Sequence, residues 1–214
     1  NSKISKNVTN KKKTLAVRFP KHPVSRKLLK LLKYPLAAPS ANISTKISPV
    51  SSKDVEDEFG KKIKFVLDGG RSKIGLESTI VGLINGTQIL RLGGIEIKKI
   101  NKVLKTNLKY KPKNKTLNVP GQFKTHYSPG IPIRMNANKP RPGEAFILIK
   151  KRKSSDKNFY YLSKKNNLKE AAKNLYKTLR MIKNKKFKKI AIEKIPNIDF
   201  GEAINDRISR ASKV

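Results

Sequence analysis

The chain of 214 residues contains no cysteine, few acidic residues and no long apolar run. Without cysteine it forms no disulfide and has no thiolate for catalysis or metal binding. No apolar stretch approaches the ~20 residues that a membrane-spanning helix needs. The basic start, residues 1–13, also lacks the apolar core of a signal peptide. We therefore expect a soluble, cytoplasmic protein that does not use a membrane as a partner.

The 14 acidic residues stand against 51 Lys and Arg, which gives a formal net charge of +37. Such a surplus suits an RNA partner. However, only 10 of the basic residues are Arg, and aromatic residues make up 7% of the chain. Proteins that read bases or stack on them rely on Arg and aromatic side chains. Since a lysine excess with many Asn and Ile also arises from an A+T-biased genome, a solvated lysine surface explains the charge as well as RNA binding does.

The first half of the chain predicts strands and helices in alternation. A proline opens the first helix, Ser51 or Ser52 caps the second, and Gly60 ends it. The dipeptide Asn85-Gly86 between two apolar runs is a strong hairpin signal. Strands are expected at residues 14–19, 36–38, 65–67 (buried), 78–84 and 87–92. Helices are expected at residues 23–33, 51–59 and 95–104.

The second half separates into a linker and a further folded unit. Periodicity disappears from residue 105 to about residue 130, where Lys, Asn and Pro dominate. Beyond it, strands and helices alternate again, which favours a small α/β domain with a partly parallel sheet. The strands are expected at residues 145–149, 159–162 and 190–192, and the helices at 168–182 and 201–211. The predicted division is therefore 1–104, 105–130 and 131–214.

Four clusters of small and polar residues follow one another at the ends of apolar runs between residues 37 and 94. Hydroxyls and amides at strand ends can reach a ligand, and glycines let the backbone approach phosphate closely. One such cluster would be an ordinary turn, but four in succession predict a site. They are Ala37-Ala38-Pro39-Ser40-Ala41-Asn42 with Ser48-Pro49, Asp68-Gly69-Gly70, Gly75-Leu76-Glu77-Ser78-Thr79, and Leu90-Arg91-Leu92-Gly93-Gly94.

These clusters resemble the second half of the YrdC-like domain of L-threonylcarbamoyladenylate synthases. Pro120-Gly121 with His126-Tyr127-Ser128-Pro129 resembles the linker of the long two-domain form of that family. Ala203-Ile204-Asn205-Asp206-Arg207 with Arg210-Ala211 resembles the close of its C-terminal domain. The resemblance implies an α/β fold, with a twisted mixed-sheet YrdC-like domain and a small Rossmann-like C-terminal domain.

The resemblance also implies a nucleotidyltransferase. Members of the family convert L-threonine, bicarbonate and ATP, with Mg²⁺ as the expected metal, into threonylcarbamoyl-AMP and pyrophosphate. A downstream threonylcarbamoyl transferase then uses the product to modify tRNA, and contact with double-stranded RNA is a further expectation. Because two anionic partners must meet, the site needs cations and preorganised donors.

The family positions that touch substrate can be carried over to this sequence residue by residue. By resemblance, L-threonine would be bound by Arg18, by Ala38 through its backbone, and by Ser78. The ATP contacts would come from Thr14, Ser40, Asn42, Ser48, Arg91, His126 and Tyr127. His126 and Tyr127 would form a lid that excludes water from labile intermediates.

Each of these residues also has a plain structural interpretation. Arg18 would be a surface residue, Arg91 an exposed ladder residue, and the Ser and Asn residues parts of turns. The His126-Tyr127 segment would be a tether. Asp68 would cap a turn or bind metal, and Glu77 would support magnesium or fix the Ser78 loop. No catalytic residue and no metal ligand is assigned.

The sequence departs from the family pattern in two places. Nothing before Thr14 corresponds to the family's Lys-x-Arg motif, which clamps ATP phosphates, and the chain begins with Asn rather than Met. We therefore expect an N-terminally truncated fragment that is inactive by itself. Ser44-Thr45 stands where the family usually has Ser-Gly, so that loop is expected to be less tight.

Two other functions remain open on the sequence. One is a YrdC-like carbamoyl-adenylating module of hydrogenase maturation, but the cysteine pairs of its zinc knuckles are missing. The other is an RNA-binding protein without catalysis. RNA affinity that falls steeply with salt, without threonine-dependent ATP turnover, would distinguish this alternative.

Overall fold

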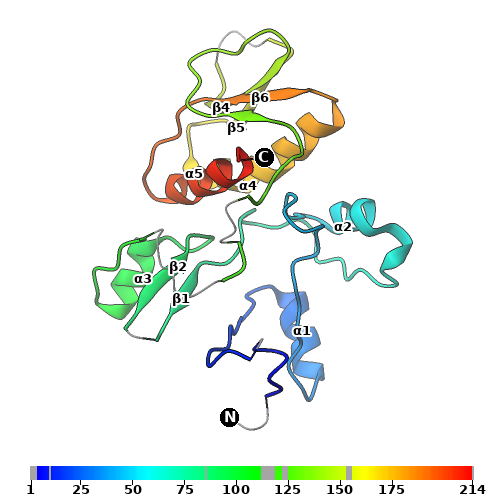
Figure 1. Cartoon of the computed structure of the whole chain (residues 1–214), viewed down its shortest axis with the longest axis vertical. Helices are drawn as coiled ribbons and strands as arrows, with labels where there is room; N and C mark the ends of the chain where they lie inside the picture. Colours follow the sequence, from blue (N-terminus) through cyan, green and yellow to red (C-terminus); the bar gives the residue numbers. More distant parts are fainter. Residues whose placement is uncertain are drawn as a thin grey trace.

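The computed structural model of this chain describes residues 4–9, 11–84, 86–111, 119–121, 125–152 and 156–213. Its elements form two units. The first unit holds the elements α1 to α3, and the second holds β3 to α5. In Figure 1, helices α4 and α5 of the second unit lie between the sheet of that unit and the elements of the first unit. Among the described residues, no helix is both long and apolar enough to cross a bilayer.

The first unit confirms three predicted helices and the hairpin. Helix α1 covers Pro23–Leu31, α2 covers Ser52–Phe59 and α3 covers Ile97–Leu104, and a short 3-10 turn, η1, follows α2 at Gly60–Lys62. The Ser51 side chain caps α2 by accepting a hydrogen bond from the Asp54 amide. Strands β1, Ile80–Gly82, and β2, Gln88–Arg91, pair in antiparallel fashion. Asn85 of the predicted turn lies outside the described residues.

Three predicted strands of the first unit are wrong. Residues 14–19, 36–38 and 65–67 are assigned no strand structure. Their apolar side chains are mostly exposed, with Val17 and Phe19 at 83% and Phe65 at 89%. The burial expected at residues 65–67 is therefore wrong as well. An alternating apolar pattern shows that a segment is suited to a sheet, but a strand also needs a neighbour for its backbone hydrogen bonds. No described segment pairs with these three.

The second unit is built around a four-stranded parallel sheet. The strands are β3, Ile133–Arg134; β4, Glu144–Lys150; β5, Phe159–Ser163; and β6, Lys189–Ile192. Their order is β3-β6-β4-β5, and each neighbouring pair is parallel. Helix α4, Leu168–Asn184, connects β5 to β6, and α5, Phe200–Ala211, closes the chain. The mixed α/β fold with a parallel sheet is confirmed, and β3 was not foreseen.

Helices α4 and α5 cover one face of this sheet. A long apolar run makes β4 buried on both sides, as is usual for a central parallel strand. Its Ile147 packs with Leu175 and Leu179 of α4 and Ile204 of α5 in the main core. That core also includes Ile47, Val50 and Tyr127, which lie outside the second unit. The two units therefore share one apolar core, and α4 and α5 present their remaining faces to the first unit.

Candidate functional site

The carboxylate of Glu77 lies at the centre of the polar contact between the two units. Glu77 precedes β1, and its side chain is 17% exposed. Its oxygens accept hydrogen bonds from the Ser48 hydroxyl at 2.6 Å, from the Tyr176 hydroxyl at 3.0 and 3.1 Å, and from Arg207 Nε at 3.0 Å. Tyr176 belongs to α4 and Arg207 to α5. One carboxylate thus joins the first unit to both helices of the second.

Arg207 is the largest buried side chain of this cluster, at 1% exposure. Besides Glu77, its guanidinium donates to Asp206 Oδ2 at 2.6 Å and to the Leu92 carbonyl at 2.6 Å. The guanidinium also lies over the Tyr127 ring, 4.9 Å from its centroid. All three of its nitrogens donate, so the buried charge is paired and hydrogen-bonded, as burial of a charge requires.

The protonation states of the cluster follow from burial and from these contacts. Burial raises the pKa of Glu77, but the Arg207 guanidinium and the Ser48 hydrogen bond outweigh it and hold that pKa below its ordinary value. Burial, together with the Glu77 charge, raises the pKa of Tyr176 well above its ordinary value. At neutral pH the Glu77 carboxylate is therefore ionised and can accept hydrogen bonds but cannot donate one. Tyr176 keeps the proton that it donates.

Arg91 fixes the backbone beside this carboxylate. Its guanidinium donates to the Ser78 carbonyl from Nε at 3.0 Å and from Nη2 at 2.8 Å, and to the Pro120 carbonyl from Nη1 at 2.9 Å. Arg91 is therefore not an exposed ladder residue, which was the plain structural interpretation of this position. Arg91 instead connects the β1–β2 hairpin, the loop before it and the linker.

Tyr127 is the buried anchor of the linker, at 1% exposure. Its ring lies 4.0 Å from that of His126 and stacks on Tyr176 at 5.8 Å between centroids. Burial, with the Glu77 charge adding to it, raises the pKa of Tyr127 to about 12. The Tyr127 hydroxyl has no hydrogen-bond partner among the described residues. Residues 122–124 of the predicted lid segment lie outside the described part of the chain.

Two residues with left-handed backbones meet where the linker joins the first unit. Tyr127 has φ +63° and Thr45 has φ +68°. The Ser128 amide donates to the Thr45 carbonyl at 2.9 Å, and Lys46 forms a parallel bridge with Ser128. Thr45 therefore occupies a conformation that favours Gly, which explains why the family usually has Gly there. The Thr in this chain adds local strain.

Asn42 is buried, but its amide serves the turn that contains it. Its Nδ2 donates to the carbonyls of Ile43 at 2.9 Å and Lys46 at 3.2 Å. Its Oδ1 is buried and accepts no hydrogen bond from the described residues. The amide of Asn42 therefore serves its own turn, and its role as an ATP contact stays a prediction.

Four of the predicted site residues are not brought to the Glu77 cluster by any contact. Arg18, Ala38 and Ser40 are exposed and Thr14 is half-buried. The side chains of Thr14, Arg18 and Ser40 make no hydrogen bond to another described residue. Their proposed roles depend on the resemblance alone and stay predictions.

Asp68 and His22 make hydrogen bonds within the first unit that have a structural role. Asp68 Oδ1 accepts from the Gly70 amide at 2.8 Å, so Asp68 caps its turn. His22 Nε2 hydrogen-bonds to the Gly69 carbonyl at 3.0 Å. Within the described residues, no three His, Cys, Asp or Glu side chains form a group that could hold a metal ion.

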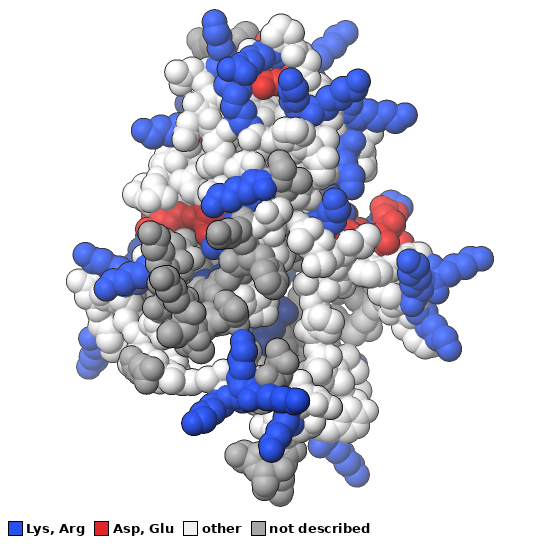
Figure 2. All heavy atoms as spheres, viewed as in Figure 1, with Lys and Arg blue, Asp and Glu red and all other residues white. Residues whose placement is uncertain are grey.

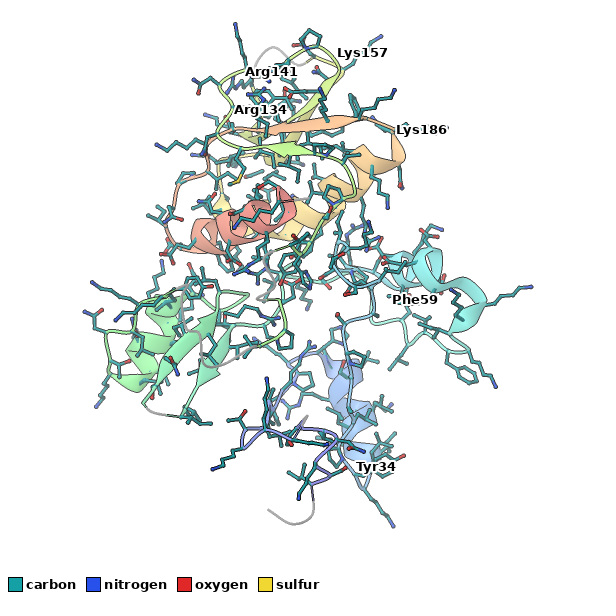
Figure 3. The ribbon with its side chains drawn as sticks, viewed as in Figure 1. Tyr34, Phe59, Arg134, Arg141, Lys157 and Lys186 are labelled. Carbon is teal, nitrogen blue, oxygen red and sulfur yellow. The ribbon has the colours of Figure 1, made fainter. Side chains whose placement is uncertain are left out.

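On the face shown in Figure 2, the Lys and Arg side chains of the described residues are spread out rather than gathered in one stripe. In Figure 2, Lys and Arg project from the top, the sides and the bottom of the visible face. Arg134 and Arg141, labelled in Figure 3, lie at the end of the second unit that faces away from the first. There the Arg134 guanidinium pairs with Glu144 Oε2 at 2.6 Å. This pair is far from the Glu77 cluster and stabilises the start of β4.

Two cavities of about 460 and 490 Å³ lie in the second unit and share Lys151. Their described lining residues include no predicted site residue.

Tyr176 and Arg207 were missed as members of the site. Arg207 lies among Ala203, Ile204, Ile208 and Ala211 on the apolar face of α5, and all of them are buried. A charged residue at a core position of an amphipathic helix requires a partner, and this signal is visible in the sequence. Tyr176 gives no comparable signal, because a tyrosine on an apolar stripe is usually part of the core.

The fold and the site define an α/β protein with a polar cluster between a hairpin unit and a parallel-sheet unit. The family described as "Telomere recombination" matches residues 1–93, and that described as "Threonylcarbamoyl-AMP synthase, C-terminal domain" matches residues 95–213. The chain belongs to the threonylcarbamoyl-AMP synthase family. This confirms the family that the sequence resembles.

Individual relatives agree with this placement. The threonylcarbamoyl-AMP synthase of Pyrococcus abyssi is 32% identical over 93% of this chain and 64% of its own length. That of Bacillus subtilis is 29% identical over 98% of this chain and 66% of its own length. The crystal structure of P. abyssi Sua5 complexed with L-threonine superposes with a TM-score of 0.84 at 30% identity, over 98% of this chain and 67% of that one.

The chain thus spans less than two thirds of the length of both curated relatives. The two family matches cover residues 1–93 and 95–213 of this chain and do not test the expectation of a truncated fragment, which stays a prediction.

Proposed function

We propose that the protein forms threonylcarbamoyl-AMP and pyrophosphate from L-threonine, bicarbonate and ATP. The observation that carries this proposal is the grouping of Ser48, Ser78, Arg91 and Tyr127 near Glu77, with Tyr127 lying against the Arg207 guanidinium that pairs with Glu77. These four residues match family positions that contact threonine or nucleotide. A similar solved structure is a complex with L-threonine, which supports a threonine site in this chain.

The reaction combines two anions, so the protein has to bring them together. The threonine amine adds to bicarbonate with loss of water and gives a carbamate. A carbamate oxygen then attacks the α-phosphorus of ATP, the bond from that phosphorus to the β-bridging oxygen breaks, and pyrophosphate leaves. The protein contributes orientation and charge neutralisation in a site from which water is excluded. Mg²⁺ would arrive on the ATP phosphates.

The contacts of Ser48 indicate which part of ATP it would touch. Its single hydroxyl proton is donated to Glu77, whose low pKa makes it an acceptor only. The Ser48 oxygen can therefore accept from a ligand but cannot donate to one. An acceptor suits the adenine amino group or a ribose hydroxyl. It does not suit a phosphate oxygen, so we place Ser48 on the nucleoside part of ATP.

Ser78 is the threonine contact that the geometry supports best. Its carbonyl is held by Arg91, while its exposed hydroxyl makes no hydrogen bond to a described residue. A fixed backbone with a free hydroxyl is preorganised for a ligand. Arg18 and Ala38 would complete the threonine site, and Thr14, Ser40 and Asn42 the ATP site.

The experiment measures threonine-dependent release of pyrophosphate from ATP in the presence of bicarbonate, with the full-length natural protein. Replacing Ser78 by Ala should raise KM for L-threonine about 10- to 100-fold, because a hydrogen bond to a charged ligand is worth about 1.5–3 kcal/mol. Ser72→Ala is the matched control, since Ser72 is also exposed and is close in sequence. No threonine-dependent turnover in the wild type would refute the function.

The linker would act as a lid over bound nucleotide. Replacing Tyr127 by Ala should then lower product yield per ATP consumed, and the rate should fall roughly 10- to 100-fold, or about 1–3 kcal/mol. Tyr127→Phe keeps the ring and should retain coupling. Equal rates and equal yields for wild type and Tyr127→Ala would show that the segment is only a tether.

The remaining expectations belong with this proposal. They are a cytoplasmic location, transfer of the product to a tRNA-modifying enzyme, and contact with RNA. A non-catalytic RNA-binding protein is the second candidate, supported by the net charge of +37. Affinity for double-stranded RNA that falls steeply with salt, with no pyrophosphate release, would favour it.

A further inference from the structure

The loop of residues 75–79, called the Glu77 loop below, is held mainly from the second unit. Among the described residues, three side chains donate to the Glu77 carboxylate, and two of them, Tyr176 and Arg207, come from α4 and α5. The third, Ser48, comes from the first unit. The site residues of one unit are thus attached to the helices of the other.

The backbone of the same loop lies directly against α4. Gly75 has φ +79°, and a Cβ on it would lie 2.5 Å from the carbonyl oxygen and 2.6 Å from the Cα of Lys173. Such distances leave no room for a side chain. On its other side, the loop is held by Arg91 at the Ser78 carbonyl and by the Gly94 amide, which donates to the Glu77 carbonyl at 2.8 Å. The loop therefore lies between the hairpin and α4.

The charges explain why this attachment is specific. Arg207 is buried and has already given its other nitrogens to Asp206 and Leu92, so its Nε is directed at Glu77 alone. The pKa of Tyr176 is raised, so its hydroxyl remains a donor at all physiological pH values. An acceptor between two such fixed donors has one favourable position, and a shift of Glu77 would leave the buried Nε of Arg207 and the hydroxyl of Tyr176 without their acceptor.

Two proposed substrate contacts depend on that position. Ser48 donates its proton to Glu77, and Ser78 is the next residue along the loop. We propose that Tyr176 and Arg207 are positioning residues, which hold Ser48 and Ser78 in the geometry that binds ATP and L-threonine. This inference rests on the proposed function. It gives the second unit a role in substrate binding that acts through the Glu77 loop and requires no direct contact with a substrate.

The test replaces Tyr176 by Phe in the full-length natural protein. This removes one donor to Glu77 and leaves the ring that stacks on Tyr127. Tyr160→Phe is the matched control. Tyr160 is also a buried tyrosine of the second unit, but its hydroxyl has no hydrogen-bond partner among the described residues.

We expect Tyr176→Phe to raise KM for both L-threonine and ATP by about 3- to 10-fold, with kcat changed by less than about twofold. Amide hydrogen exchange in the Glu77 loop should become faster, while exchange in β4 stays unchanged. Tyr160→Phe should change neither the KM values nor the rate of hydrogen exchange in the Glu77 loop. A residue with a merely structural role would lower the melting temperature without changing KM at temperatures where the protein is folded.

Each outcome decides the inference. Equal KM values for wild type and Tyr176→Phe would overturn it, whether or not exchange in the loop is faster. Equal effects of Tyr176→Phe and Tyr160→Phe would also overturn it. If the wild type turns over and Tyr176→Phe has unchanged KM values, the positioning role is refuted and the proposed function stands. A wild-type protein without threonine-dependent turnover refutes the proposed function and this inference with it.

Discussion

Gly93 is the position where one added methyl group should disturb the Glu77 cluster most directly. A Cβ on Gly93 would lie 2.5 Å from the Ser78 carbonyl carbon and 2.5 Å from the Thr79 amide nitrogen, and it would also clash with the Glu77 carbonyl oxygen. Ordinary contacts between non-bonded heavy atoms are about 3.5–4.0 Å, so the two backbone segments would have to separate by about 1 Å.

The cost of this separation can be estimated from the contacts that it strains. Gly93 follows Leu92, whose carbonyl accepts from Arg207, and it lies against the backbone of the Glu77 loop. Overpacking of this kind costs about 1–3 kcal/mol, and a strained hydrogen bond to a buried charge adds to it. We expect Gly93→Ala to destabilise the protein by about 2–3 kcal/mol. For a chain of this size, the melting temperature should fall by about 4–12 °C.

Gly94→Ala is the matched control, because the neighbouring methyl group would meet mainly the side chain of Ile74, at 3.1 and 3.2 Å. A side chain can move by a few tenths of an ångström at small cost, so the loss should stay below about 1 kcal/mol. Urea unfolding and thermal melting of the two variants give the comparison. Equal stabilities for Gly93→Ala and Gly94→Ala would refute the close backbone approach on which the architecture of the site depends.

Two further predictions concern strain and pH. Thr45→Gly should relieve a left-handed φ that costs about 1–2 kcal/mol, partly offset by the entropy of Gly, for a net gain of about 0.5–1 kcal/mol in urea unfolding; Ser44→Gly should give no gain. The lowered pKa of Glu77 means that its contribution to stability is present above its ordinary value of 4.5 and is lost as pH falls through the folded value. Glu77→Gln should therefore flatten the loss of stability between pH 5 and pH 3, as urea midpoints would show.

A specific result would contradict each of the predictions for Thr45→Gly and Glu77→Gln. A lower melting temperature for Thr45→Gly would mean that Thr45 makes contacts outweighing its strain. The exposed Glu56 provides the control for pH, and Glu56→Gln should leave the acid transition as it is. If Glu77→Gln and wild type lost stability in parallel on acidification, Glu77 would not be the ionised acceptor that the geometry indicates.

Local sequence signals were sufficient for the five α-helices and for the second unit apart from β3. The Ser51 cap, the opening proline of α1 and the apolar stripe of α4 involve residues within a few positions of one another. The same holds for the apolar run of β4, since a strand buried on both faces needs no partner to be recognised. One of the clusters of small residues contains Glu77, which accepts hydrogen bonds from both units, and such clusters can be recognised locally because turns and close approaches demand Gly, Ser and Asn.

The features that only the tertiary structure determined involve residues that are far apart in the chain. Residues 14–19 and 65–67 have the pattern of strands, but pairing depends on a neighbour that no local pattern specifies. The hydrogen bond from Arg207 to Glu77 joins residues 130 positions apart, and that from Tyr176 to Glu77 joins residues 99 apart. The hydrophobic periodicity of a helix or strand predicts which of its faces is buried, but it does not predict which residues that face contacts. The sequence therefore predicted the loop that carries Ser78, and the fold determined which side chains hold it in place.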